Sequence, residues 1–311
     1  RQPVEIEAEA SHAAADVIFR TLFSIPIEDQ LAQEVFHSFR AYQQDQPILN
    51  LAAFLRLPHW FPRFHRRRSR EHARHIRGLI TALTEERQRQ IAEGCAPRDL
   101  ATKIMTTPDP QTGQCFSADE MVDQVAIFFL AGHETSASAL ACAPDWQDAV
   151  AEEARAADLS EFAAMSLLRI SRDVFREALR LYPPVPMMVR EAAEPKTFRN
   201  RKVPKGAQIV LSPWHLHRHE RLWSDPDGFD PGRWQTENGK SCQRSAYMPF
   251  SAGPRVCTGA GFAMVEGVLM LSMILRQFRI SPVPGKTPVP AAHLTVRSKN
   301  GIWLQLTRRE P

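Results

Sequence analysis

Residues 249–259 read PFSAGPRVCTG and place one thiol, that of Cys257, in a tight loop punctuated by glycines. An apolar run from about Ala260 to Phe278 follows directly, and its periodicity predicts a helix. A thiol at the N-terminus of a helix faces free backbone N–H groups and the positive end of the helix dipole. We therefore expect Cys257 to be stabilised as a thiolate.

A lone thiolate with an arginine two residues before it and a glycine two residues after it suits an axial ligand of haem iron. Phe250 can shield the sulfur side of the ring. Gly253 and Gly259 allow a close backbone approach where a Cβ would collide with the macrocycle, and Arg255 can reach a haem propionate. A buried structural cysteine is the alternative for an isolated thiol, but the combined F-x-x-G-x-R-x-C-x-G pattern favours the haem ligand.

This loop resembles the thiolate loop of the cytochrome P450 family of haem-thiolate monooxygenases. The resemblance implies a mainly α fold with small β-sheets, in a single domain over residues 1–311. It also implies that haem b (iron protoporphyrin IX) lies between a distal oxygen-binding helix, at about residues 117–142, and the Cys257 loop with its following helix.

The distal helix is predicted from its start signal, because residues 117–120 (SADE) match a capping box ahead of a very apolar run. An acid and a hydroxyl side by side in such a run are costly unless they are paired or hydrated. The stretch Ala131-Gly132-His133-Glu134-Thr135 resembles the family's Ala/Gly-Gly-x-Asp/Glu-Thr segment. The resemblance implies that Ala131 contacts the haem, Thr135 holds dioxygen and its water, and Glu134 relays protons. A kinked core helix with ordinary Ser/Thr back-bonding is the alternative, and His133 fills the variable position.

A second landmark is the Glu-x-x-Arg pair formed by Glu177 and Arg180, whose spacing puts both charges on one helix face. The resemblance implies that this pair joins Arg233, from the segment FDPGRW at residues 229–234, in a buried network that holds the thiolate loop. The family more often has Glu where Gly232 stands. An isolated Glu-x-x-Arg is usually a surface pair, so this interpretation depends on the order of the motifs.

Further residues are assigned by their place relative to these motifs. Arg190 lies ten residues past Arg180, where the family often has a second contact to a haem propionate. Residues 183–188 would pass beside the haem, and residues 294–295 resemble a turn that dips into the substrate cavity. Core packing remains an equal alternative for the first of these segments. The predicted substrate pocket comprises Phe128, Val185, Met187, Leu294 and Thr295.

The composition is that of an ordinary soluble globular protein, because 43% of the 311 residues are hydrophobic and 24% are charged. A net charge of +4 is too weak to argue for a nucleic-acid partner. Five scattered cysteines without a C-x-x-C pair argue against a disulfide framework or a zinc site and for a reducing compartment, which predicts a cytoplasmic protein. No window holds eighteen consecutive apolar residues, so no membrane span is expected.

The first two-thirds of the chain is predicted to be mostly helical. The chain begins without Met, is short for the family and has no Trp-x-x-x-Arg ahead of its first helices. A helix also stops abruptly near residues 140–146, so we expect that ordered segments have been joined. The predicted elements are helices at 10–23, 30–44, 65–91 and 159–181, strands within 197–211 with a turn at 205–206, and a hairpin at 294–306 that turns at 300–301.

Together these features predict a monomeric monooxygenase that inserts one atom of dioxygen into an apolar small molecule. No G-x-G-x-x-G fingerprint is present, so the electrons would come from a separate ferredoxin or flavoprotein reductase. The alternatives are a peroxide-using or isomerising haem-thiolate enzyme, a non-catalytic haem sensor or carrier, and a helical scaffold without a cofactor. An intact acid–threonine pair favours the monooxygenase over the peroxide-using and isomerising enzymes.

Overall fold

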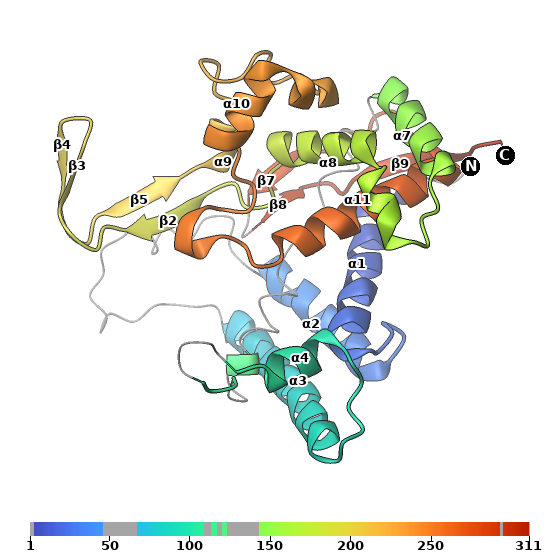
Figure 1. The fold of residues 1–311 in the computed structure, drawn as a ribbon, viewed down its shortest axis with the longest axis vertical. Helices are drawn as coiled ribbons and strands as arrows, with labels where there is room; N and C mark the ends of the chain where they lie inside the picture. The colour runs from blue at the N-terminus through green and yellow to red at the C-terminus, as the bar shows by residue number, and fades with distance from the viewer. Residues whose placement is uncertain are drawn as a thin grey trace. The chain divides into compact units, whose positions relative to one another are not determined.

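The computed structural model describes residues 3–45, 67–108, 113–116, 120–122, 143–292 and 295–310. Their contacts divide the chain into two compact units, which are described separately. Unit 1 comprises Arg1–Glu7 and His133–Pro311, and unit 2 comprises Ala8–Gly132. The chain is mainly helical with small antiparallel sheets, as its sequence predicted (Figure 1). That the two units form one domain remains a prediction.

Unit 2 is built from amphipathic helices whose apolar sides form one core. Helices α2 and α3 pack against each other, and α3 packs against α4. The helices predicted at 10–23, 30–44 and 65–91 are present, with α1 beginning four residues earlier than the sequence pattern indicated, whereas most of the helix predicted at about 117–142 lies outside the described residues. The core includes Phe19, Leu22, Val35, Ile80 and Met121. The helices are α1 (Ile6–Phe23), α2 (Gln30–Asp45), α3 (Arg67–Ala92) and α4 (Leu100–Thr106).

The short helix α4 was not predicted, and Asp99 accounts for it. The Asp99 side chain accepts a hydrogen bond of 3.0 Å from the Thr102 N–H, which caps the helix. Asp99 also pairs with Arg87, and both side chains are at most 5% exposed. Arg87 donates to the Phe23 carbonyl oxygen at 2.7 Å and to the Thr102 hydroxyl at 2.9 Å. This buried group therefore links the ends of α1, α3 and α4.

Three helices pack pairwise in unit 1: α7 (Pro144–Ala156), α8 (Arg169–Leu181) and α11 (Ala260–Gln277). The single helix predicted over 159–181 is instead a short 3-10 turn, η2 (Phe162–Ser166), followed by α8. The N–H and hydroxyl of Ser160 both donate to Asp158, at 3.0 and 2.7 Å. Such local side-chain bonds compete with helix formation, which explains why α8 starts later than expected.

The C-terminal strands correct another prediction. β1 (Pro3–Glu5), β9 (Trp303–Arg308) and β6 (Phe278–Pro282) form an antiparallel sheet in the order β1-β9-β6, whereas β7 (Pro290–Ala292) pairs with β8 (Val296–Ser298). The predicted 294–306 hairpin is therefore wrong, because β8 and β9 do not pair. A turn with Gly301 at φ +73° is present. However, the backbone of Ile302 bonds Ile6 and the Glu5 carboxylate, so non-local pairing determines the partners of β9.

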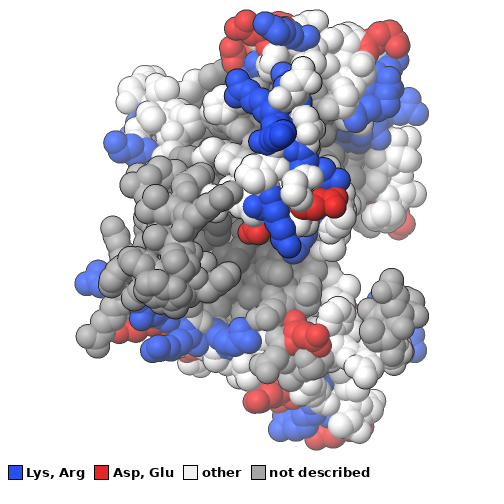
Figure 2. All heavy atoms as spheres, turned by 90° about the vertical axis from the view of Figure 1, so that its left-hand side faces the viewer, with Lys and Arg blue, Asp and Glu red and all other residues white. Residues whose placement is uncertain are grey.

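The remaining strands form two small antiparallel sheets, β2 (Met188–Glu191) with β5 (Gln208–Leu211) and β3 (Lys196–Phe198) with β4 (Arg201–Val203). In Figure 1 the β3–β4 hairpin projects from the end of the β2–β5 sheet. Figure 2 views the molecule from that side and shows Lys and Arg side chains gathered on the described surface. The cations of the hairpin and the turn after it are Lys196, Arg199, Arg201, Lys202 and Lys205.

Short elements connect β5 to α11, whose composition is unusually apolar. By length and composition alone, α11 is apolar enough to cross a membrane, with a mean hydropathy of 1.3. A core helix of a soluble protein passes the same test, and α11 packs against α7 and α8 through its buried residues Val268, Leu271 and Leu275. The connecting elements are α9 (Pro213–Leu216), η3 (Pro231–Gln235), α10 (Glu237–Ser245) and η4 (Gly253–Arg255).

Candidate functional site

The Cys257 loop is closed by backbone hydrogen bonds. The Cys257 N–H donates to the Phe250 carbonyl oxygen at 2.8 Å, and the Val256 N–H donates to the Gly253 carbonyl oxygen at 3.0 Å. Gly253 has φ +69°, and a Cβ built on it would meet no atom within 4 Å. Glycine is therefore favoured at this position by the backbone conformation rather than by crowding within the protein.

The thiol of Cys257 is accessible, and the space beside it is open. Every residue from 252 to 258 is exposed, and Cys257 is a free thiol. A Cβ added at Gly259 would lie 3.9 Å from the Cys257 Sγ, so it would occupy this space. No group of three or more His, Cys, Asp or Glu side chains in the described ranges is placed to hold a metal. One accessible sulfur with free space beside it thus fits a cofactor that brings its own metal ligands, as a porphyrin does.

Arginine side chains border this loop. Arg190 lies on β2, and its Nη2 donates to the Ser251 hydroxyl at 2.9 Å, next to Phe250. Ser251 has φ +65° and also approaches the Met188 sulfur, with its Oγ 3.3 Å from Sδ. Arg255, at the end of η4, is exposed. The structure thus places the guanidinium group of Arg190 against the loop, beside the segment that carries the thiol.

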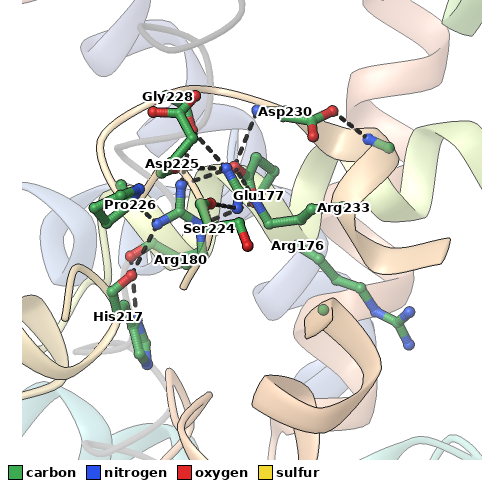
Figure 3. Close-up of polar contacts among 12 residues, drawn as sticks. Arg176, Glu177, Arg180, His217, Ser224, Asp225, Pro226, Gly228, Asp230 and Arg233 are labelled. Carbon is green, nitrogen blue, oxygen red and sulfur yellow. Dashed lines mark hydrogen bonds and ion pairs between the residues drawn. The ribbon is translucent and has the colours of Figure 1, made fainter. Parts of the chain in front are cut away.

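Glu177, Arg180 and Arg233 lie together in a fully buried network (Figure 3). Arg180 donates to both Glu177 carboxylate oxygens, at 3.0 and 2.8 Å. Arg233 donates through Nε to Glu177 Oε1 at 2.9 Å. The side chains of Glu177 and Arg180 are 0% exposed and that of Arg233 is 5% exposed, so this network is not a surface pair.

The network contains two guanidinium groups and one carboxylate, so it carries excess positive charge. The two arginines direct their remaining N–H groups at backbone carbonyl oxygens. Arg180 donates to the carbonyl oxygens of His217 and Gly228, both at 2.8 Å. The Asp230 N–H donates to Glu177 Oε1 at 3.0 Å. These bonds satisfy the buried donors, and they join α8 to residues 217–233. The further carbonyl acceptors are those of Ser224, Asp225, Gly228 and Pro226, the first three for Arg233 and the last for Arg180.

His217 and Tyr247 bind this network to the start of the thiolate loop, and sequence reasoning missed both. His217 Nε2 accepts a hydrogen bond of 2.9 Å from the Met248 N–H. The Tyr247 hydroxyl donates to the Arg176 carbonyl oxygen at 3.1 Å, and burial raises the pKa of this phenol. Neither residue belongs to a motif, because their partners are backbone groups that any sequence supplies. Only the tertiary structure identifies them.

The predicted pocket residues that can be located lie on neighbouring segments. The Val296 N–H donates to the Pro184 carbonyl oxygen at 2.8 Å, which places Thr295 near Val185. Thr295 is 6% exposed, whereas Val185 and Met187 are 37% and 39% exposed. Their solvent-accessible surface distinguishes Val185 and Met187 from ordinary core residues. Phe128, Ala131, Glu134, Thr135 and Leu294 lie outside the residues that the structure describes.

Comparison with known proteins identifies the family. The family model for cytochrome P450 matches residues 1–305. The chain therefore belongs to the cytochrome P450 family, whose members carry a haem-thiolate cofactor, and the donor set at Cys257 fits that cofactor.

Several relatives and solved structures are similar to the chain. Cyclooctatin synthase of Streptomyces melanosporofaciens is 32% identical over 95% of the chain and 66% of its own length. Cyclooctat-9-en-7-ol 5-monooxygenase of the same organism is 34% identical over 87% of the chain and 60% of its own length. The haem domain of cytochrome P450DA superposes with a TM-score of 0.80 at 24% identity, covering 100% of this chain and 69% of that domain. The chain thus spans at most about two-thirds of these relatives.

Proposed function

We propose that this chain is the haem-binding part of a monooxygenase that inserts one atom of dioxygen into an apolar small molecule. Haem b is the proposed cofactor, and a separate ferredoxin or flavoprotein reductase is the proposed electron source. The observation that supports this most directly is the accessible Cys257 thiol at the start of α11, in a closed loop with free space beside the sulfur. Membership in a family with named monooxygenases among its relatives supports the reaction class.

Each residue has a proposed task at the site. Cys257 would ligate the iron, and a thiolate-ligated haem would supply oxygen activation. Arg190 and Arg255 would bind propionates, Phe250 and Gly259 would border the sulfur, and Ala131 would contact the haem. The buried network of Glu177, Arg180 and Arg233 positions the loop. In this proposal the protein binds the cofactor and orients it, and the cofactor carries out the oxygen chemistry.

The distal side of the site is assigned from the sequence. Thr135 would orient water, and Glu134 would move protons toward it, as general acid–base residues do. The substrate wall would consist of Val185, Met187, Thr295, Phe128 and Leu294, which together favour an apolar substrate. A Streptomyces relative named as a monooxygenase of cyclooctat-9-en-7-ol is in line with such a substrate.

Replacing Cys257 with histidine tests the proposal. The haem-loaded wild-type protein, reduced under carbon monoxide, should give the difference spectrum typical of a thiolate ligand. Cys257→His should lose it, whereas Cys95→His, at an exposed thiol near the end of α3, should keep it. A variant at Cys257 that retains the thiolate-type spectrum would show that another residue ligates the iron. A second measurement distinguishes an enzyme from a haem carrier: the wild-type protein, supplied with a reductase and dioxygen, should release an oxygenated product if it is an enzyme.

A cytoplasmic, monomeric protein without a nucleic-acid partner is proposed on the cysteine pattern and the modest net charge of +4. The apolar helix α11 is compatible with this proposal, since α11 packs against α7 and α8. Cell fractionation and sedimentation of the expressed chain measure both properties. Recovery in the membrane fraction, or a sedimenting dimer, would contradict the corresponding part.

A further inference from the structure

His217 is completely buried directly after α9, and both of its ring nitrogens are used. Nδ1 lies 3.1 Å from the Arg180 carbonyl oxygen, and Nε2 lies 2.9 Å from the Met248 backbone nitrogen. In return, Arg180 Nη1 donates to the His217 carbonyl oxygen at 2.8 Å. Figure 3 shows His217 beneath Arg180, at the edge of the buried network. His217 and the end of α8 are thus joined by two hydrogen bonds.

These partners define the protonation state of the ring. A carbonyl oxygen only accepts a hydrogen bond, so Nδ1 must carry the proton that is donated to Arg180. A backbone N–H only donates, so Nε2 must be unprotonated to accept from Met248. The ring therefore has to be neutral, with its proton on Nδ1. The other tautomer and the charged form would each place an N–H of the ring against the N–H of Met248.

Met248 is where the thiolate loop begins. Its carbonyl oxygen accepts a hydrogen bond of 3.2 Å from the Ser251 N–H, and the Phe250 carbonyl oxygen accepts one of 2.8 Å from the Cys257 N–H. A short series of backbone bonds thus runs from the ring of His217 to the residue that carries the sulfur. The adjacent Tyr247 ring packs against the His217 ring, with 5.3 Å between the ring centroids.

We propose that His217 is a positioning residue that fixes the start of the Cys257 loop to the end of α8 and works only as the neutral tautomer with its proton on Nδ1. This inference rests on the proposed role of Cys257 as the iron ligand. The residue acts through Met248 and has no contact with the sulfur. Its loss should therefore change how firmly the thiolate is held rather than remove the ligand.

The surroundings of His217 oppose its protonation. The charged and titratable groups that face it are Arg180 of α8, Arg218 directly after it and Tyr247 of the segment after α10. Burial lowers the pKa of His217 to about 4, and the charges of Arg180 and Arg218 lower it as well, against the effect of the bond to the Arg180 carbonyl. The ring is thus neutral at physiological pH, as its two hydrogen bonds require.

Substitutions can separate the two ring bonds. His217→Asn keeps a donor near the position of Nδ1 but has no acceptor that reaches Met248. His217→Gln places an acceptor near the position of Nε2 and gives up the bond to Arg180. His219→Asn is the matched control, because His219 lies on the same turn and is exposed. All are tested as full-length, haem-loaded protein.

Amide hydrogen exchange at Met248 and the reduced carbon monoxide spectrum are the readouts. In His217→Asn we expect Met248 exchange to accelerate about fivefold, the factor that corresponds to one ordinary hydrogen bond. In the reduced carbon monoxide spectrum, the fraction of protein whose Cys257 is a neutral thiol rather than a thiolate should rise by a similar factor. His217→Gln keeps an acceptor for Met248 and the Arg180 bond to the backbone carbonyl of residue 217, so it should stay close to wild type in both readouts, as should His219→Asn. Equal exchange and equal spectra in His217→Asn and His219→Asn would overturn the proposal.

Nitrogen NMR of the wild-type protein labelled at histidine tests the tautomer even if the His217 variants fail to fold. A protonated Nδ1 with an unprotonated Nε2 at neutral pH is expected, and the reverse tautomer or a charged ring would refute the inference. Failure of the proposed function gives a different result, because the wild-type protein itself would then lack a thiolate-type spectrum while the His217 tautomer and the Met248 exchange would still respond as described.

Discussion

Burial decides the role of Glu177 and Arg180 at the scale of single residues. Their i, i+3 spacing is common on solvent-exposed helix faces, where such a pair contributes little. Here both side chains are 0% exposed. Removing Glu177 would leave two buried guanidinium charges without a carboxylate, and removing Arg180 would leave Glu177 Oε2 and the carbonyl oxygens of His217 and Pro226 without this donor. Five backbone carbonyl oxygens from residues 217–228 accept hydrogen bonds from the two arginines, which offsets the desolvation of an excess positive charge.

Arg180→Ala should lower the free energy of unfolding by about 3–5 kcal/mol, the usual cost of breaking a buried charge pair. It should also yield little haem-loaded protein, because Arg180 bonds both Glu177 and the carbonyl oxygen of His217. Arg169→Ala, at an exposed position on the same helix, should stay within about 0.5 kcal/mol of wild type. Urea unfolding and the haem-to-protein absorbance ratio measure both effects. Normal loading of the Arg180 variant would contradict the assigned role.

Thr135→Ala tests the distal assignment made from the sequence. The change removes only a hydroxyl and a methyl group, so haem and substrate binding should remain nearly intact. General acid–base groups typically contribute about 10²–10⁴-fold, so the product formed per reductant oxidised should fall clearly, with more of the electrons recovered as hydrogen peroxide. Ser136→Ala is the neighbouring control. The substrate would come from an absorbance screen of a compound library, and unchanged coupling would assign Thr135 to packing.

The N-terminus of helix α8 is capped by a side chain from another helix, α7. It has no capping side chain of its own at Leu168. Instead, the carboxylate of Glu153 on α7 accepts hydrogen bonds from the Ile170 N–H, the Ser171 N–H and the Ser171 hydroxyl, at 2.7, 2.8 and 2.7 Å. A carboxylate at this position also interacts favourably with the helix dipole. The orientation of Glu177 and Arg180, further along α8, therefore depends on contact with α7.

Glu153→Ala should destabilise the protein by about 1–2 kcal/mol, the upper range for loss of a helix N-cap. Glu152→Ala provides the control, because Glu152 is the preceding residue of α7 and is exposed. Urea unfolding followed by circular dichroism measures both variants. Equal midpoints for the two would show that the carboxylate of Glu153 does not support α8.

At the scale of the whole molecule, local sequence patterns predicted helices and turns, but they did not predict which distant strands pair. The apolar run at 260–278 predicted α11 to within one residue, because its start and its apolar content are encoded locally. The Asn300-Gly301 signal predicted a turn correctly but the strand partners wrongly, because β9 pairs with β1, from the other end of the chain. Helix α4 was missed because its seven residues are too few to show a helical period, although Asp99 caps it locally.

The candidate site was predictable to the extent that fixed spacings encode it. Glu177 and Arg180 were identified by their spacing, and Arg233 was added through the family resemblance. The structure brings these residues together. His217, Tyr247 and Ser251 act through backbone atoms or through partners more than thirty residues away, so no local pattern indicates them. The sequence therefore identified only those site residues that belong to a motif of fixed spacing.

Two side chains with strongly shifted pKa values, His217 and Glu266, should give stability an unusual pH dependence. The pKa of His217 is lowered to about 4 by burial, against 6.5 in an unfolded chain, so between these values the unfolded state binds a proton that the folded state does not. Stability from this residue is therefore complete above pH 6.5 and decreases as the pH falls toward 4. Burial raises the pKa of Glu266 to about 7 from 4.5, so its contribution decreases as the pH rises from 4.5 through 7.

Between pH 4.5 and 6.5 the two groups oppose each other, and single substitutions should reveal each of them. In Glu266→Gln only His217 remains, so the free energy of unfolding should rise with pH relative to wild type, by up to about 1.4 kcal/mol per pH unit for one proton. In His217→Phe only Glu266 remains, and the slope relative to wild type should have the opposite sign. Urea titrations at half-unit pH steps provide both differences, in which the remaining carboxylates cancel because every variant carries them. Parallel pH profiles for wild type and both variants would mean that neither side chain keeps its shifted pKa in solution. Slopes of opposite sign would show that the neutral ring next to Arg180 and the neutral carboxyl on α11 are both properties of the folded protein.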